Sequence, residues 1–426
     1  MAIESDVLVI GRGIAGMAAG TAAARAGADV RVVAGTESTL RQASGLIDVL
    51  GYPGNGSGPL VDPFSGFDAL SDEHPYRTIG EGSVRAGLAL FDDVVGDAYL
   101  GDHTNRNALV PTHGGTVKPT ARYPQACAAG LASDPRDALL VGFETVPDLD
   151  APLVAEHLGA AGVPFDVRGV TVPFPGEFRQ DAKRTRYAQA LDADELLSVD
   201  GYSLPAREAL AERVKEHLGN ESRVGFPALL GLDRPDEVRA DLAELLGVEI
   251  FEVAMGPPSI PGMRLGVYLE RGLREAGATL STGNLVVDYD AERDRIDRVF
   301  VDRNGARIPY RAEEYVLATG GLVGKGVGAD RERVSEPVFN CHVPHPENRY
   351  DWFVDEAFGE HPFARFGVRT DDQLRPLDAD GRPEFGNLRA AGSVLGGYDF
   401  AAEKSGGGVS LATGRLAGEL AAKEVA

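Results

Sequence analysis

The sequence predicts an α/β fold that combines a nucleotide-binding βαβ unit, an inserted second α/β unit and a return to the first sheet. Residues 6–34 follow the pattern strand, glycine loop, helix, strand. Strands and helices of 10–15 residues alternate again from about residue 137. Segment 276–321 then joins several strands by polar turns and ends in "YVLATGG". The expected divisions are 1–136, 137–258 as an inserted cap or substrate domain, and 259–426.

Length and composition fit a soluble globular protein of two or three structural units. The chain has 426 residues, 43% of them hydrophobic and 25% charged. No stretch approaches the ~20 apolar residues of a membrane span. The start "MAIESDVLVIGRG" lacks the basic region of a signal peptide and leads directly into a strand, so we expect a cytoplasmic location, with docking onto a membrane-bound partner left open.

The charged residues indicate the habitat of the protein more than its chemistry. The net charge is −23, the acids are scattered, and the bases are mostly Arg with only six Lys. Dispersed acid with little Lys suits a cytoplasm of high salt, where repulsion between charges is screened. The same balance excludes nucleic acid as a partner, since that function needs a basic face.

The first glycine loop predicts a nucleotide site. Asp6–Ile10 is a short apolar strand, and Gly11, Gly13 and Gly16 follow it as G-x-G-x-x-G. The first Gly permits the turn, the second lets a phosphate approach the backbone, and the third allows close helix packing. The helix that we expect from about 14 to 26 directs its N-terminal amides at that anion. A structural turn that has lost its ligand is the alternative.

One element of a dinucleotide site is missing. An acid at the end of the second strand usually binds the adenosine ribose. Here that place holds Val33, Ala34, Gly35 and Thr36, and Glu37 comes slightly late. Either Glu37 reaches back, or the ligand has no adenosine ribose there, as in FMN.

The segment after this unit contains "ASGLID", with Ser44 and Gly45. It stands where many flavoproteins fold a loop back over the cofactor, although Ser44 is equally understood as a turn residue. The Gly/Pro-rich run 51–59 predicts a surface loop.

Several side chains of the middle region carry open alternatives. Arg264, after the turn "GPPSIPGMRL", either clamps an anionic substrate or lies on a surface helix. His113 and Lys118 line a cleft or a plain turn. A local basic concentration either attracts a phosphorylated substrate or an acidic partner, or forms a solvated helix face. It consists of Arg179, Lys183, Arg184 and Arg186.

The cysteines and histidines predict no metal site. Cys127 and Cys341 lie far apart with no CxxC, which excludes a cysteine-ligated cluster within this chain. The spacing Cys341–His342–His345 hints at a metal, but no fourth ligand is evident and prolines interrupt the run. His361 has no evident partner for acid–base work.

The last part of the chain predicts the second wall of a cofactor site. The strand end "ATGG", with Gly320 and Gly321, is how two-dinucleotide-type flavoproteins return to their nucleotide sheet. "GSVLGGYDFAAEKSGGGVS" follows, in which Gly392 ends a strand and Gly406–Gly408 open the final helix. We expect the amides of that helix to face the electron-rich edge of a flavin.

The region "LRPLDADGRPEFGNLRAAGSVLGGYDFAAEKSGGGVS" resembles the B subunit of anaerobic glycerol-3-phosphate dehydrogenase, as do "ASGLIDVL", "GPPSIPGMRL" and "FGVRTDDQLRP". Both ends more distantly resemble the flavin domain of fumarate reductase-type enzymes. The resemblance covers most of the chain and is weakest from about 137 to 250. It implies a two-dinucleotide-binding-type flavoprotein with an inserted α/β cap.

The resemblance further implies a flavin, with FMN favoured and FAD an alternative, in a complex that oxidises sn-glycerol 3-phosphate to dihydroxyacetone phosphate and reduces quinone. A sister subunit would carry FAD and the glycerol-phosphate site, and a third would carry iron–sulfur clusters and the membrane contact. The implied flavin contacts are Gly11, Gly13, Gly16, Ser44, Gly45, Gly320, Gly392, Ser393, Gly406, Gly407, Gly408 and Val409.

Two departures from the wider flavoprotein pattern leave the catalytic residues unassigned. Ser393 stands where an acid usually binds the ribityl chain, and a hydroxyl bonds less strongly than a charged acceptor. No Arg and His pair for proton delivery can be placed. A stand-alone flavin oxidoreductase of the fumarate reductase or enone reductase type and a non-catalytic electron-relay or scaffold subunit are therefore the alternatives.

Overall fold

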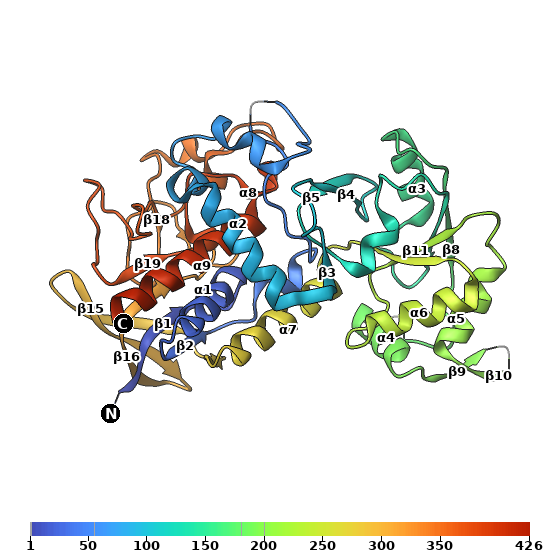
Figure 1. Ribbon diagram of the computed structural model, residues 1–426, viewed down its shortest axis with the longest axis horizontal. Helices are drawn as coiled ribbons and strands as arrows, with labels where there is room; N and C mark the ends of the chain where they lie inside the picture. The colour runs from blue at the N-terminus through green and yellow to red at the C-terminus, as the bar shows by residue number, and fades with distance from the viewer. Residues whose placement is uncertain (1, 55, 180, 200) are drawn as a thin grey trace. The chain divides into compact units, whose positions relative to one another are not determined.

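A computed structural model describes residues 2–54, 56–179, 181–199 and 201–426. The chain forms two compact units (Figure 1). The first unit comprises 1–39, 47–96 and 267–426, and the second comprises 40–46 and 97–266. The predicted insertion 137–258 falls within the second unit, which extends further on both sides. The extension follows from packing, because the 3-10 helix η4 (Gln125–Gly130) contacts the sheet strands β11 and β12 of that unit.

The described part of the first unit is built on a seven-stranded sheet. The strand order is β13-β2-β1-β16-β15-β14, and β19 pairs with β16. β1, β2, β13, β16 and β19 run parallel, whereas β14 and β15 form antiparallel pairs. The bounds are β1 (Ile3–Ile10), β2 (Val30–Ala34), β13 (Thr279–Thr282), β14 (Val286–Glu292), β15 (Arg295–Arg303), β16 (Ala306–Leu317) and β19 (Leu388–Ala390).

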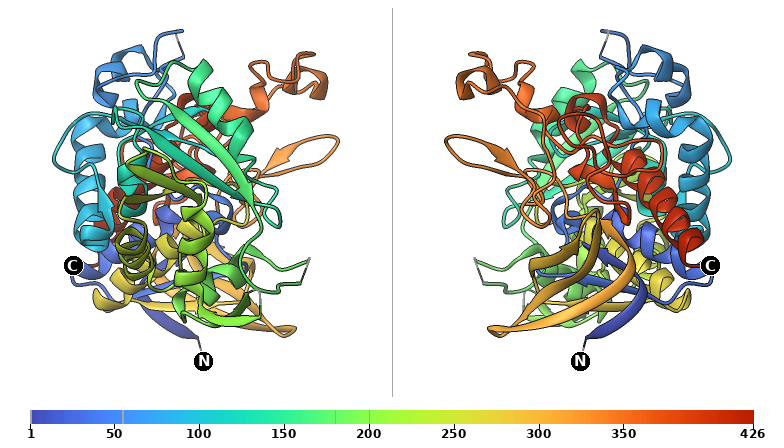
Figure 2. Two further views of the ribbon diagram at one scale, coloured as in Figure 1. Left: turned by 90° about the vertical axis from the view of Figure 1, so that its right-hand side faces the viewer. Right: turned by 90° about the vertical axis from the view of Figure 1, so that its left-hand side faces the viewer.

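Two helices from opposite ends of the sequence pack together over this sheet. They are α1 (Ile14–Arg25) and α9 (Gly406–Val425), and α9 also packs on α2 (Pro75–Val95) (Figure 2). A Cβ on Gly414 would lie 2.3 Å from the carbonyl oxygen of Ala15, and one on Gly418 would lie 2.1 Å from that of Ala19. Small residues thus let the two backbones approach closely, which fixes the N-terminal and C-terminal glycine motifs relative to one another.

Shorter elements complete the first unit. They are α8 (Phe400–Glu403), η2 (Pro63–Ala69), η5 (Arg349–Trp352), η6 (Pro362–Arg365), η7 (Gly392–Val394) and the hairpin of β17 (Gly328–Ala329) and β18 (Val334–Ser335). The unit boundary at 266/267 falls within α7 (Ile260–Glu275), and η1 (Thr39–Gln42) and η3 (Gly96–Ala98) lie at the other boundaries.

The described part of the second unit contains a four-stranded parallel sheet in the order β12-β11-β7-β8. Its strands are β7 (Ala138–Phe143), β8 (Val167–Val172), β11 (Arg223–Pro227) and β12 (Glu249–Val253). β7 and β11 are buried along their whole length, as expected for strands covered on both faces. The helices are α3 (Ala151–Ala160), α4 (Arg184–Asp192), α5 (Ala206–Lys215) and α6 (Pro235–Leu246). Short hairpins pair β3 (Tyr99–Leu100) with β6 (Tyr123–Pro124), β4 (Ala108–Pro111) with β5 (Val117–Thr120), and β9 (Leu196–Val199) with β10 (Tyr202–Pro205).

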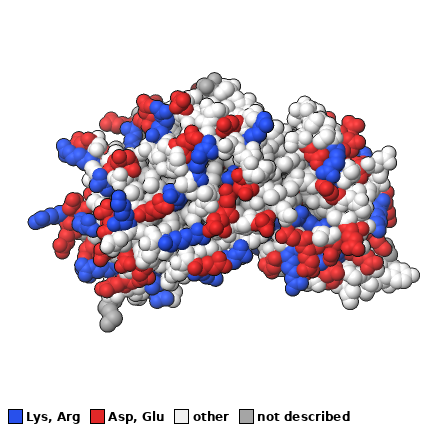
Figure 3. Space-filling view, viewed as in Figure 1, with Lys and Arg blue, Asp and Glu red and all other residues white. Residues whose placement is uncertain are grey.

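The surface carries the dispersed charge that the sequence predicts. Figure 3 shows Asp and Glu spread over the face drawn, with Arg and Lys among them. None of the helices in the described ranges combines the length and apolar character that a membrane span requires. In the same ranges no group of three or more His, Cys, Asp or Glu side chains could hold a metal ion.

Candidate functional site: a glycine-built flavin cradle

The predicted phosphate loop connects β1 to α1 as expected. Gly11 has a φ of +120°, and a Cβ there would lie 2.1 Å from the carbonyl oxygen of Ala318. A Cβ on Gly16 would lie 1.9 Å from the carbonyl oxygen of Gly11. Both positions therefore require glycine for packing alone.

Gly13 differs from its two neighbours because it is not needed for packing. It has an ordinary φ of −75°, and a Cβ there would meet no atom within 4 Å. Gly13 is the N-cap of α1, no side chain caps the helix, and its first turn holds no acid. Unpaired amides at a helix start with open space beside them suit a phosphate. This loop therefore fits the phosphate end of a nucleotide.

The end of β16 forms the next wall. The amide of Ala318 donates to the carbonyl of Ile10 at 2.8 Å, which holds this strand end beside the phosphate loop. Gly320 has a φ of +90°, and a Cβ on Gly321 would lie 2.6 Å from the carbonyl oxygen of Ser393. Oγ1 of Thr319 is buried and finds no hydrogen-bond partner among the described residues. An unpaired hydroxyl at this place supplies one polar contact for a ligand.

The strand end at Gly392 lies against α1 and α9. Gly392 has a φ of +78°, and a Cβ there would lie 2.6 Å from that of Ala15. Its amide donates to Oγ1 of Thr413 at 2.9 Å, and that hydroxyl donates to the carbonyl of Val409 at 2.6 Å. Ser393 lies beside Tyr398: burial raises the pKa of the Tyr398 phenol, and the Ser393 hydroxyl lowers it in part.

The glycines that open α9 have a different physical reason from the one expected. A Cβ on Gly407 would lie 3.0 Å from the amide of Asp48, and one on Gly408 would lie 2.2 Å from the hydroxyl of Tyr76. These glycines therefore let α9 pack closely on the protein itself. The side chain of the N-cap Ser405 does not cap the helix, and no acid lies in its first turn. A flavin contact at Gly406, Gly407, Gly408 and Val409 stays a prediction.

A buried polar cluster behind the start of α9 escaped sequence reasoning. Glu403 accepts hydrogen bonds from Nε2 of His74 at 3.1 Å and from Oγ of Ser405 at 3.0 Å. Nδ1 of His74 accepts from the amide of Tyr76 at 2.9 Å, so Nε2 carries the proton in the neutral ring. The three elements that meet here fix the first turn of α9. The one sequence signal is His74 before Pro75, a helix N-cap followed by proline at N1.

The place of the ribose acid is filled differently. Ala34 ends β2 and is buried, and a Cβ on Gly35 would lie 2.2 Å from the side chain of Leu285. Arg12 of the phosphate loop donates from Nε to the carbonyl of Thr36 at 3.2 Å and from Nη1 to Glu270 at 3.3 Å. A cation rather than an acid therefore stands at this strand end.

Ser44 and Gly45 belong to the second unit and are not placed with the other predicted residues. Oγ of Ser44 accepts from the amide of Leu46 at 3.4 Å, as in a turn. Gly45 has a φ of +81°, and its carbonyl accepts from the hydroxyl of Tyr99 at 2.7 Å.

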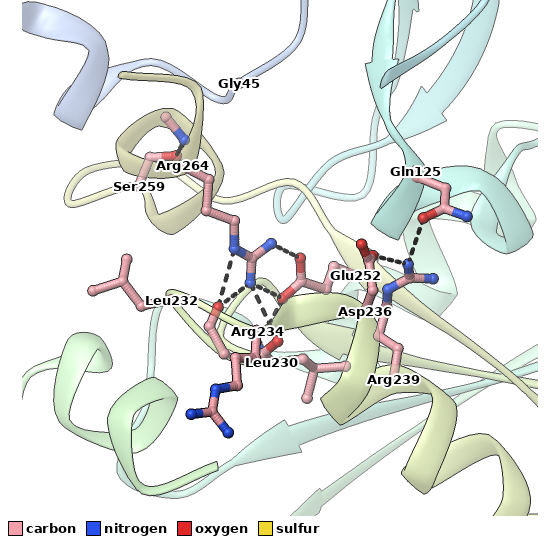
Figure 4. A network of polar contacts seen from close by, with 12 residues as sticks. Gly45, Gln125, Leu230, Leu232, Arg234, Asp236, Arg239, Glu252, Ser259 and Arg264 are labelled. Atoms are coloured by element: carbon pink, nitrogen blue, oxygen red, sulfur yellow. Dashed lines mark hydrogen bonds and ion pairs between the residues drawn. The ribbon is translucent and has the colours of Figure 1, made fainter. Parts of the chain in front are cut away.

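Both sequence interpretations of Arg264 are wrong. The side chain is 5% exposed, so it does not lie on a surface, and it pairs with the fully buried Glu252 at 2.6 Å (Figure 4). It also donates to the carbonyls of Leu230 and Gly231. Burial and Glu252 raise the pKa of nearby Cys127 to about 12, which makes this cysteine an inert core residue. The network stabilises the second unit and leaves Arg264 engaged.

Comparison with known proteins identifies the family. The model of the FAD binding domain matches residues 6–409. A probable B subunit of anaerobic glycerol-3-phosphate dehydrogenase from Halobacterium salinarum is 60% identical over 425 residues, which cover 100% of this chain and 99% of the relative. The chain belongs to the B-subunit family of anaerobic glycerol-3-phosphate dehydrogenase.

More distant members of this B-subunit family match equally far along the chain. The protein of this name from Pectobacterium carotovorum is 29% identical over 98% of this chain and 99% of its own. The solved 3-ketosteroid delta1-dehydrogenase of Sterolibacterium denitrificans matches 99% of both chains with 12% identity and a TM-score of 0.42.

Membership in the B-subunit family confirms the flavoprotein fold that the sequence predicts. The FAD binding domain spans both glycine motifs, so the chain is a flavin-binding protein of the oxidoreductase class. The preference for FMN receives no support from this match, because the family model is described by FAD.

Proposed function

We propose that this chain is the flavin-bearing subunit of a complex that oxidises sn-glycerol 3-phosphate to dihydroxyacetone phosphate and passes electrons toward quinone. The observation that carries the proposal is the cradle of Gly11, Gly13 and Gly16, in a chain 60% identical to a protein named as the B subunit of this enzyme. A bound flavin supplies the hydride and electron chemistry, which no side chain can supply.

The chain's own residues bind and orient that group. The α1 amides beside Gly13 hold a phosphate, and Thr319 donates one further hydrogen bond. The amides of the uncapped first turn of α9 stabilise negative charge at the ring edge. Gly320, Gly392 and Ser393 lie at the strand ends between these two helices. We assign no catalytic acid or base.

The more specific part of the proposal is FMN, with FAD as its alternative. The end of β2 offers Arg12 instead of a carboxylate, and the guanidinium suits a terminal phosphate better than a ribose diol. Mass analysis of the flavin released from the purified protein decides between the two.

Partner subunits follow from the names of the relatives, each of which is called one subunit of a larger enzyme. We propose an FAD-containing catalytic subunit and an iron–sulfur subunit that places the complex on the inner face of the membrane. Five exposed apolar side chains lie within one segment of the first unit, which supports a contact with another subunit. They are Tyr350, Phe353, Val354, Phe358 and Phe363. Purification from the native host should give a particle larger than the 45.0 kDa of the chain.

The experiment that tests the function uses the pure chain and the assembled complex. We expect a yellow protein whose flavin is reduced by sn-glycerol 3-phosphate when the partner subunits are present. Reduction of the chain alone would instead support a stand-alone oxidoreductase. A flavin that neither substrate nor partner reduces would support a scaffold role.

A further inference from the structure

One buried arginine of the second unit lacks a full set of partners. Arg184, Arg207, Arg223 and Arg264 are each 5% exposed or less. In the last three, Nε and both terminal nitrogens donate hydrogen bonds to carboxylates or carbonyls. In Arg184, Nη2 donates to the carbonyl of Gly256 at 3.1 Å, but the buried Nη1 has no partner among the described residues.

A second unpaired donor lies on the same helix. Arg184 is the first residue of α4, and Tyr187 follows three positions later, on the same helix face. Tyr187 is fully buried, and its hydroxyl has no hydrogen-bond partner in the described part of the chain. Its ring packs on Phe174 and Phe178, each at a centroid distance of 4.8 Å, so its position is fixed.

The surroundings place these donors at the edge of the sheet where α/β folds bind ligands. Gly256 follows the end of β12, and Asp148 follows the end of β7. In parallel sheets the carboxyl ends of the strands share one edge, which is the usual ligand edge. A Cβ on Gly256 would lie 3.3 Å from the ring of His113, so this imidazole lies against the residue that Arg184 contacts.

The groups near these donors suit an anion. Nδ1 of His113 donates to the carbonyl of Ala254 at 3.3 Å, which leaves Nε2 as the second ring position available to a ligand. Asp148 would oppose an anion, but it lies 3.8 Å from Nε of Arg184 and its side chain is 51% exposed. It can therefore turn toward solvent when a ligand binds.

We propose that Arg184 and Tyr187 form a binding site for a small phosphomonoester in the second unit. A guanidinium nitrogen and a phenol hydroxyl are both donors here, and they match the acceptor oxygens of a phosphate. The site itself rests on the unpaired atoms, whereas the choice of sn-glycerol 3-phosphate as its ligand rests on the proposed function.

The test is a calorimetric titration of the full chain with sn-glycerol 3-phosphate, inorganic phosphate or D-glycerate at constant ionic strength. We expect the phosphomonoester to bind more tightly than glycerate. Arg184→Gln should weaken its binding at least tenfold, about the effect of losing one charge-assisted hydrogen bond. The matched control is Arg186→Gln, which removes the same charge from an exposed position paired with Glu195 and should change binding less than about twofold.

Tyr187→Phe keeps the test decisive if Arg184→Gln fails to fold. It removes only the hydroxyl, so the ligand-free protein should melt no lower than wild type while binding weakens about threefold or more. The proposal is overturned if wild type binds no phosphorylated probe at millimolar concentration, if both arginine variants weaken binding equally, or if glycerate binds as tightly. The flavin absorbance of the same samples reports on the proposed function separately.

Discussion

The two units prepare for anions in opposite ways. The first uses backbone: its phosphate loop consists of glycines and small residues, and α1 presents amides without a capping side chain. The second has no such glycine loop in its described part and buries several arginines instead. Backbone amides recognise a phosphate at one fixed place, whereas a buried guanidinium also stabilises the fold. The difference teaches that glycine marks ligand contact only where packing does not already demand it, and that a buried arginine marks a site only where its donors are unpaired.

The largest effect should come from breaking the buried ion pair of the second unit. Arg264→Met leaves the carboxylate of Glu252 buried without its partner and should lower the free energy of unfolding by about 3–5 kcal/mol. Urea unfolding measures this without changing the ionic strength.

The double variant Arg264→Met/Glu252→Leu is the matched control for this pair. It removes both charges and should regain most of the loss. A loss of less than about 1 kcal/mol in the single variant would show that Arg264 is not essential to the unit.

The next effect separates packing from ligand contact in the first unit. Gly13→Ala adds a methyl group where no protein atom lies within 4 Å, so unfolding should be unchanged without flavin. A phosphate close to that backbone would be displaced, and flavin affinity should fall at least tenfold. Fluorescence titration with FMN and FAD measures it.

Two further glycine variants frame this result. Gly16→Ala should not fold, because its Cβ would lie 1.9 Å from a backbone oxygen. Gly82→Ala, on α2 with open space around it, should leave flavin binding unaffected. Unchanged affinity in Gly13→Ala would place the phosphate elsewhere.

The smallest effect concerns an ion pair near the surface of the second unit. Hydrogen bonds from Arg136 lower the pKa of Asp134 to about 2, below its value of ~3.9 in an unfolded chain. The pair therefore stabilises the fold above pH ~4, and the contribution disappears as the pH falls toward 2. Asp134→Asn should cost about 1 kcal/mol or less at neutral pH. The difference between wild type and variant in urea unfolding should vanish in acid, and a pH-independent difference would contradict the assignment.

The sequence predicts the first unit well because its signals are local. The strand, Gly11–Gly16 and the helix after them occur where expected, and α9 begins at Gly406 as predicted. The packing reason for Gly407 and Gly408 was not predictable, since it depends on Tyr76 and Asp48, more than 300 residues earlier.

The second unit was harder to read because its contacts are long-range. Arg264 looks like any helix arginine until Glu252 and the carbonyl of Gly231 surround it. Arg184 stands in a basic run whose other members include the exposed pairs Arg179–Asp181 and Arg186–Glu195. Only the fold distinguishes the buried member from the solvated ones.

The central claim is that this chain itself carries a flavin in the glycine cradle, and the most direct measurement is the flavin content of the pure protein. Denaturation of the purified chain followed by mass analysis of the supernatant should release close to one flavin per chain, and the Gly13→Ala variant should release much less. A colourless wild-type protein that releases no flavin and takes up neither FMN nor FAD would contradict the account.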